Sequence, residues 1–209
     1  MQVLGYGEDA LTLWAIKNRL AEILRAQSDS TDVSKCRVFF RPSFGRAGGA
    51  GSAQFVEFDF LILSETRLYL GESKWGRSPE ELREGVVEIR QTQTMRHKVF
   101  EFYVREWAFG EYCSWREFTE KAQARLLTWL DGIAKPLAPE NSLLASNLQA
   151  VLGIIRQHYI SEPEIVNVLL YLHRAAPEWE IPRDASSGFE LVALDYSGDA
   201  EGNFVRLEL

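Results

Sequence analysis

Two apolar segments separated by only three residues constrain the fold of this chain most strongly. The first covers residues 54–63 (QFVEFDFLIL) and the second residues 67–75 (RLYLGESKW). Both are rich in aromatic and branched side chains, which favour extended strands. The short connection Ser64-Glu65-Thr66 is typical of a tight turn between antiparallel neighbours. The pattern therefore predicts a β-hairpin of two long strands.

The remaining segments give the order of elements around this hairpin. Apolar residues at a spacing of three to four predict helices, and short β-forming runs predict strands. Helices are expected at 9–25, 80 to about 109, 114–130, 142–159 and 164–175, and further strands at 36–41, 189–196 and 204–207. The order of one helix, three strands, several helices and two strands indicates an α/β or α+β fold with a mixed sheet flanked by helices.

Composition excludes several classes of protein. The chain is 46% hydrophobic, which excludes intrinsic disorder, and it has no uninterrupted apolar run long enough to span a membrane. The start lacks the features of a secretory signal, and the two cysteines, Cys36 and Cys113, give no disulfide framework. We therefore expect reduced thiols and a cytoplasmic location.

Charge is distributed unevenly along the chain. Residues 1–110 hold 15 basic and 15 acidic residues, whereas residues 111–209 hold 8 basic and 15 acidic residues. The whole net charge of −7 therefore belongs to the second half. An anionic ligand is expected to prefer the first half, because the electrostatic repulsion is weaker there.

Charged residues interrupt both strands of the predicted hairpin. Alternation places Glu57 and Asp59 on one face of the first strand, and Glu72 and Lys74 on one face of the second. Asp59 and Glu72 are 13 residues apart across a tight turn, so they can lie side by side. Carboxylates in a half-buried sheet are unfavourable without a partner, and a divalent cation such as Mg²⁺ is a suitable one.

These residues resemble the signature of the PD-(D/E)XK nucleases, a superfamily with the restriction-endonuclease-like fold. The resemblance rests on Asp59 in the first strand, on Glu72-Ser73-Lys74 in the second, and on the order of the surrounding elements. It extends from residue 7 to about residue 109, and residues 189–196 match a later strand. It implies a single domain with a core at about 7–109 plus 189–209 and an additional helical segment at about 110–188.

The resemblance also implies an activity and roles for individual residues. The activity is Mg²⁺-dependent (or Mn²⁺-dependent) hydrolysis of DNA phosphodiester bonds, with water as the nucleophile. Asp59 and Glu72 match the metal-binding carboxylates, Lys74 matches the catalytic lysine, and Glu8 occupies the place of an acidic metal ligand in the first helix. Gln91 and Gln93 are candidates for a glutamine on the helix that follows, and Gln93 is the one expected to support the water.

Basic residues near the hairpin complete the expected site. Arg41 precedes a glycine-rich connection at 45–53 and Arg46 lies within it, and both are expected to contact nucleic-acid phosphates. Cutting both strands of a duplex requires two sites, so a homodimer or a larger complex is a compatible assembly.

Two other interpretations of the same residues stay open. Asp59, Glu72 and Lys74 are also compatible with a solvated sheet face that carries a cross-strand ion pair. A nuclease fold that has lost its activity is compatible with a protein-interaction or DNA-binding subunit of a defence or mobile-element system. The enzyme is expected to bind a divalent metal ion, whereas the two other interpretations do not require one. A metal titration therefore separates them.

Overall fold

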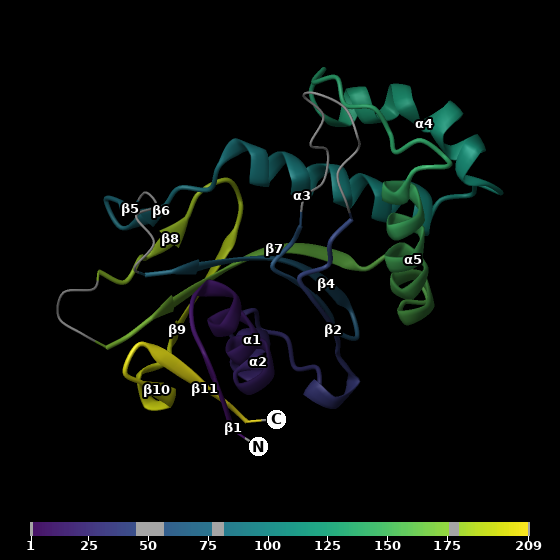
Figure 1. The fold of residues 1–209 in the computed structure, drawn as a ribbon. Helices are drawn as coiled ribbons and strands as arrows, with labels where there is room; N and C mark the ends of the chain where they lie inside the picture. The colour runs from purple at the N-terminus through teal and green to yellow at the C-terminus, as the bar shows by residue number, and fades with distance from the viewer. Residues whose placement is uncertain (1, 45–56, 77–81, 176–179, 209) are drawn as a thin grey trace. The chain divides into compact units, whose positions relative to one another are not determined.

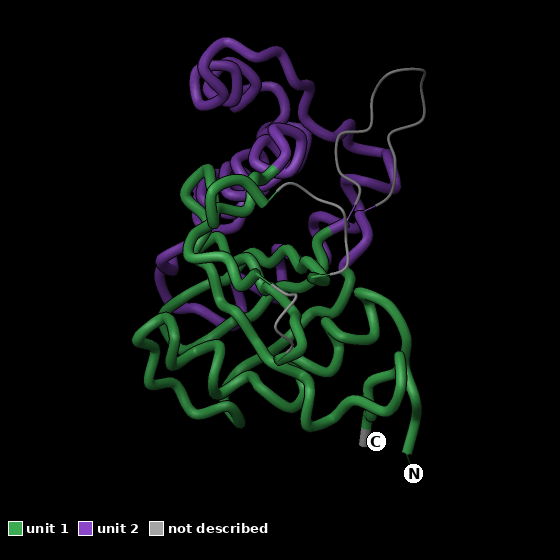
Figure 2. Tube along the Cα trace, turned by 90° about the vertical axis from the view of Figure 1, so that its left-hand side faces the viewer, with its two compact units in different colours: residues 1–41, 58–89, 166–209 green, residues 42–57, 90–165 purple. Residues whose placement is uncertain are grey.

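The computed structural model describes residues 2–44, 57–76, 82–175 and 180–208, and it divides the chain into two compact units (Figure 2). Unit 1 consists of Met1–Arg41, Phe58–Ile89 and Val166–Leu209, and unit 2 of Pro42–Glu57 and Arg90–Ile165. By sequence, unit 1 contains 13 basic and 20 acidic residues, whereas unit 2 contains 10 of each. The net negative charge therefore belongs to unit 1 alone.

A five-stranded sheet is the centre of unit 1 (Figure 1). Its strand order is β2-β3-β4-β7-β9, with bounds Arg37–Phe40, Phe60–Leu63, Arg67–Trp75, Glu164–His173 and Glu190–Asp195. Strands β2, β3 and β4 pair antiparallel, whereas β7 and β9 pair parallel. The predicted hairpin and the mixed α/β architecture are thus confirmed.

Strand β7 corrects one prediction. The sequence pattern predicts a helix over residues 164–175, but Glu164–His173 is a strand whose last six residues are buried. The segment contains Ile165, Val166 and Val168, and such branched residues favour an extended backbone. Its position between β4 and β9 is in the interior of the sheet, where strands are apolar on both faces and lose the alternation that identifies them.

One face of this sheet is covered by two short helices from the start of the chain. Helices α1 (Glu8–Asn18) and α2 (Leu20–Ala26) replace the single helix predicted at 9–25, with a break at Arg19. Their buried side chains form a common core with every second residue of the central strands. This core contains Trp14, Ile23, Phe60, Ile62, Tyr69, Val168, Leu170, Leu172, Val192 and Leu194.

A close contact between β3 and β4 fixes the packing of their paired residues. Phe60 is the cross-strand partner of Gly71. A Cβ atom at residue 71 would lie only 2.0 Å from the Phe60 ring, so the ring covers the backbone of β4 at this point. Phe60 is fully buried in the core of unit 1. Glycine at residue 71 is therefore required by the approach of the ring.

Two smaller sheets complete unit 1. The first has the order β1-β11-β10, with bounds Gln2–Gly5, Phe204–Glu208 and Ala200–Glu201. The second has the order β5-β6-β8, with bounds Leu82–Arg83, Val86–Val87 and Asp184–Ala185. Single-turn 3-10 helices occur at Val33–Lys35 and Ser197–Asp199.

The β5–β6 hairpin corrects the long helix predicted from residue 80. A two-residue turn, Glu84-Gly85, joins these strands, and its φ angles are 52° and 81°. Positive φ at both central residues is typical of the turns that match the twist of a hairpin, and glycine adopts this conformation without strain. The helix therefore begins only at Gln91.

Three helices make up most of unit 2. They are α3 (Gln91–Tyr103), α4 (Trp115–Trp129) and α5 (Leu143–His158), and a π-helical turn, Val104–Ala108, extends α3. Helices α4 and α5 confirm the predictions at 114–130 and 142–159. Ser114 and Ser142 cap these helices by accepting hydrogen bonds from backbone N–H groups. Within the described portion of the chain, no helix is both long and apolar enough for a membrane crossing.

Candidate metal site at the end of strand β4

The polar segment Glu72-Ser73-Lys74 lies near the end of β4, inside an otherwise apolar strand. Tyr69 of the same strand packs against α1 and α2, and alternation therefore directs Ser73 to that face and Glu72 and Lys74 to the opposite face. Glu72 is only 2% exposed, whereas Lys74 is half-buried. A carboxylate buried to this extent needs compensating charge or hydrogen bonds.

Asp59 reaches this segment through an irregularity in the sheet. Strand β3 begins at Phe60, later than the predicted start at residue 54, and residues 54–56 lie outside the described residues. The Asp59 N–H donates to the carbonyl of Gly71, the residue already paired with Phe60, at 3.2 Å. Two residues thus oppose one, which is the arrangement of a β-bulge and changes the direction of a side chain.

The bulge turns the Asp59 carboxylate toward the backbone of β4. Its Oδ2 atom accepts a hydrogen bond from the Ser73 N–H at 2.7 Å. In a regular ladder, a carbonyl of the neighbouring strand accepts from this N–H. Because β3 does not continue opposite Ser73, the Asp59 side chain supplies the missing acceptor. This bond places the carboxylate beside the residue that separates Glu72 from Lys74.

Glu8 supplies a second side-chain acceptor farther along β4. It is the first residue of α1, and its Oε2 atom accepts a hydrogen bond from the Trp75 N–H at 3.0 Å. The indole of Trp75 donates to the Tyr196 hydroxyl at 2.7 Å, which fixes this end of the strand. The first turn of α1 thus brings Glu8 to the strand that carries the Glu72-Ser73-Lys74 segment.

The two carboxylates therefore occupy one edge of β4. The N–H groups of residues i and i+2 in a strand point to the same side, and Ser73 and Trp75 are two residues apart, or roughly 7 Å. The next N–H group, that of Gly76, points to the other side and donates to the Leu172 carbonyl of β7 at 2.9 Å. Asp59 and Glu8 are thus bound to the N–H groups on either side of Lys74.

Arg41 is the basic residue that the structure brings to this edge. Its N–H donates to the Asp59 carbonyl at 3.0 Å, so it lies opposite Asp59 in the continuation of β2. Its guanidinium forms an ion pair with Asp9, the neighbour of Glu8 in α1. Both side chains are exposed, so a phosphate can compete for this guanidinium. Arg46, the second predicted phosphate contact, lies outside the described residues.

The two glutamine candidates belong to unit 2. Both lie in the first turn of α3, where the Gln93 Oε1 atom accepts a hydrogen bond from the Arg90 N–H at 3.3 Å. Gln93 therefore contributes to the N-terminal cap of the helix. Gln91 is exposed at the first helical position. A catalytic role for Gln93 stays a prediction.

His173 is a polar residue of the sheet that the sequence patterns do not identify. It is the last residue of β7, 6% exposed, and its Cα partner in β9 is Asp195. Leu170 and Leu172 pack toward α1 and α2, so alternation directs His173 to the face that carries Glu72 and Lys74. The helix predicted for this segment concealed the relationship, whereas its run of branched residues was a usable signal for a strand.

The donor set at this edge is suited to a particular kind of cation. A carboxylate offers about four lone-pair sites, so the bonds to Ser73 and Trp75 leave Asp59 and Glu8 further capacity as acceptors. Among the described residues, no group of three or more His, Cys, Asp and Glu side chains is arranged to hold a metal ion. Two carboxylates completed by water and substrate oxygens fit Mg²⁺, whereas structural Zn²⁺ requires four protein ligands.

Comparisons with protein-family models, with curated proteins and with solved structures find no match to this chain. The assignment of a function therefore rests on the residues at the end of β4.

Proposed function

We propose that the protein is a metal-dependent nuclease that hydrolyses DNA phosphodiester bonds at the end of β4. The observation that supports this function best is the attachment of two carboxylates, Asp59 and Glu8, to the N–H groups on either side of Lys74. An ordinary solvated sheet face would direct such side chains to water. Here both are held against a strand that also carries a nearly buried glutamate, Glu72.

The order of the sheet supports the same proposal. A PD-(D/E)XK-like core places an antiparallel meander beside a later strand, and β2, β3 and β4 form such a meander with β7 next to β4. The acidic residue precedes the second strand of the meander, and the Glu72-Ser73-Lys74 segment lies in the third.

Each residue then has a separate role in the proposed reaction. Asp59 would hold Mg²⁺ or Mn²⁺ together with one further carboxylate, Glu72 or Glu8, and water and phosphate oxygens would complete the coordination. The bound ion would supply a water molecule of lowered pKa and would neutralise charge on the phosphate. The Lys74 ammonium would orient the attacking water and stabilise the negative charge that develops at phosphorus. Arg41 would contact the phosphate backbone of the DNA and position the DNA strand at the site.

Cleavage of plasmid and single-stranded DNA in Mg²⁺, with EDTA as the reference, tests this function directly. We expect Asp59→Asn and Lys74→Gln to reduce the rate by at least about a hundredfold. The matched controls are Glu65→Gln and Lys35→Gln, which remove an exposed ion pair of the same chemistry outside the site. Both controls should retain the rate of the unchanged protein. Equal cleavage by Asp59→Asn and the unchanged protein would refute the assignment.

Calorimetric titration with Mn²⁺ separates binding from chemistry. We expect Asp59→Asn to lose the binding signal and Lys74→Gln to retain it, because the ammonium is not a metal ligand. A lack of Mn²⁺ binding together with a lack of cleavage would instead favour a nuclease fold that acts as a binding subunit. The absence of a binding signal in the unchanged protein would exclude both the proposed nuclease activity and the proposed metal site.

A further inference from the structure

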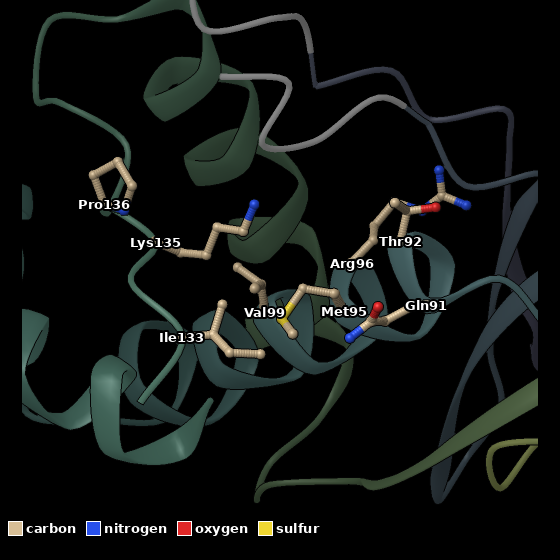
Figure 3. A pocket seen from close by; sticks show the side chains of 8 residues that line it. All are labelled: Gln91, Thr92, Met95, Arg96, Val99, Ile133, Lys135 and Pro136. Atoms are coloured by element: carbon tan, nitrogen blue, oxygen red, sulfur yellow. The ribbon is translucent and has the colours of Figure 1, made fainter. Parts of the chain in front are cut away.

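Unit 2 contains a pocket whose described lining includes one of the predicted nuclease residues, Gln91. Its volume is about 230 Å³ (Figure 3). Helix α3 forms one wall and the segment after α4 forms the other. The pocket is lined by Gln91, Thr92, Met95, Arg96, Val99, Ile133, Lys135 and Pro136.

The lining combines an apolar floor with positive charge. Met95, Val99 and Ile133 supply apolar surface, and Lys135 stands on one side of Met95 with Arg96 on the other (Figure 3). The described lining contains two cations and no carboxylate. Helix α3 begins at Gln91, which lines the pocket, so the positive end of the helix dipole lies beside it. Such a pocket favours an anion with an apolar body.

Lys135 differs from half of the ten basic residues of unit 2. Five of them form ion pairs with carboxylates, namely Lys98, Arg105, Arg116, Lys121 and Arg125. For Lys135, the described residues provide no such partner, although its backbone carbonyl accepts from Gln123. An ammonium that is half-buried and has no neutralising partner gains most from an anionic ligand.

We propose that this pocket binds a nucleotide through its phosphate and its base. Arg96 and Lys135 would contact the phosphate, because guanidinium and ammonium groups are the usual partners of phosphate oxygens. The base would lie on Met95 and Val99, since the methionine sulfur makes favourable contacts with aromatic rings. The amide of Gln91 and the hydroxyl of Thr92 would form hydrogen bonds with polar atoms of the ligand.

Two features favour a nucleotide over an aliphatic carboxylate. A phosphate monoester carries up to two negative charges, which matches two cations better than a single carboxylate does. The pocket also presents two hydrogen-bonding side chains, Gln91 and Thr92, which an aliphatic chain would leave without partners at a cost in affinity. The proposal does not depend on metal catalysis, since a nucleoside monophosphate has no phosphodiester bond to hydrolyse.

Calorimetry on the full chain in EDTA, with adenosine 5′-monophosphate as the probe, tests the proposal without any metal. Adenosine, inorganic phosphate and octanoate are the comparison ligands. We expect the monophosphate to bind at least about tenfold more tightly than each of them, because only it engages the cations and the apolar floor together. Its affinity should fall as the salt concentration rises.

Three variants assign the binding to this pocket. Lys135→Gln and Arg96→Gln should each weaken the monophosphate at least about tenfold and leave adenosine nearly unchanged. Lys98→Gln is the matched control, because Lys98 lies on the same helix but pairs with Asp131 and does not line the pocket. Equal loss in Lys98→Gln, tighter binding of octanoate, or no saturable binding of the monophosphate would each overturn the proposal. Loss of DNA cleavage in Asp59→Asn has no bearing on these outcomes.

Discussion

The end of β4 and the α3 pocket hold their charged residues in different ways. Asp59 and Glu8 are bonded to the backbone of β4, so the carboxylates proposed to bind metal also complete the hydrogen bonding of the sheet. Lys135 extends from a loop and bonds to the rest of unit 2 through its backbone carbonyl. Substitutions at the end of β4 should therefore affect stability and activity together, whereas substitutions in the pocket should affect binding alone.

The largest effect on stability is expected at Gly71 of β4, and a glycine of unit 2 provides the comparison. Gly71→Ala places a methyl group against the buried Phe60 ring, and we expect a loss of unfolding free energy of at least about 3 kcal/mol. Gly153→Ala in α5 is the control, because no described residue outside the local helix backbone lies within 4 Å of its added Cβ and alanine favours a helix by up to about 1 kcal/mol. Urea denaturation of both variants measures the contrast.

A rescue experiment identifies the cause of the loss at Gly71. Adding Phe60→Leu to Gly71→Ala removes the ring that the new methyl group meets, so it should recover some of the lost stability. A double variant whose loss equals the sum of both single losses would contradict the proposed clash.

The second largest effect should come from Asp59 itself. In Asp59→Ala the buried Ser73 N–H loses its acceptor, and we expect a loss of about 1–3 kcal/mol. Asp59→Asn retains a carbonyl oxygen at this position and should lose clearly less, while both variants should lose Mn²⁺ binding. Denaturation and calorimetry on the same samples separate the two roles. Equal stability of Asp59→Ala and the unchanged protein would show that the hydrogen bond to Ser73 contributes nothing.

Sequence patterns predicted well those elements whose signals are local. The apolar spacing of α4 and α5 identified both helices to within about one residue at each end. The strand β4 was predicted with its observed bounds, because it follows a short turn and contains branched and aromatic residues. The polar segment at 72–74 was therefore placed on the correct strand.

The patterns failed where tertiary contacts decide the structure. Strand β7 is buried on both faces of the sheet. Its apolar run therefore has no period of two, and the sequence pattern predicts a helix instead. The bulge at Asp59 depends on the point at which β3 ends opposite β4, which alternation along one strand does not encode. The hydrogen bond from Trp75 to Glu8 joins residues 67 positions apart and likewise has no local signal.

A pH titration sharpens the comparison at another carboxylate of unit 1, Asp29. Burial opposes its ionisation, but hydrogen bonds from Thr31, Ser64 and Tyr69 outweigh this effect and lower the pKa of Asp29 to about 2. Because the pKa is lower in the folded protein than in the unfolded chain, the stabilisation is present above about pH 4 and is lost as the pH falls toward 2. Because Asp29 is only partly buried, solvent screening reduces its contribution to roughly 1–2 kcal/mol.

The variant Asp29→Asn isolates this contribution. Its unfolding free energy should be lower than that of the unchanged protein at pH 6, and the difference should shrink as the pH falls from 4 to 2. Urea denaturation at a series of pH values measures the difference at each point, so the titration of all other carboxylates cancels. Parallel curves for the two proteins would contradict the lowered pKa of Asp29.

The smallest effect on stability is expected in the α3 pocket. Lys135→Gln removes a half-buried charge whose ammonium has no carboxylate partner among the described residues, so the unfolding free energy should change by less than about 0.5 kcal/mol. The same variant should lose most of its affinity for adenosine 5′-monophosphate. Denaturation with and without the nucleotide measures both quantities, because a ligand that binds only the folded state raises the unfolding free energy as its concentration exceeds its Kd. A destabilised Lys135→Gln without the nucleotide would mean that the lysine supports the fold of unit 2, and the contrast with Asp59 would then disappear.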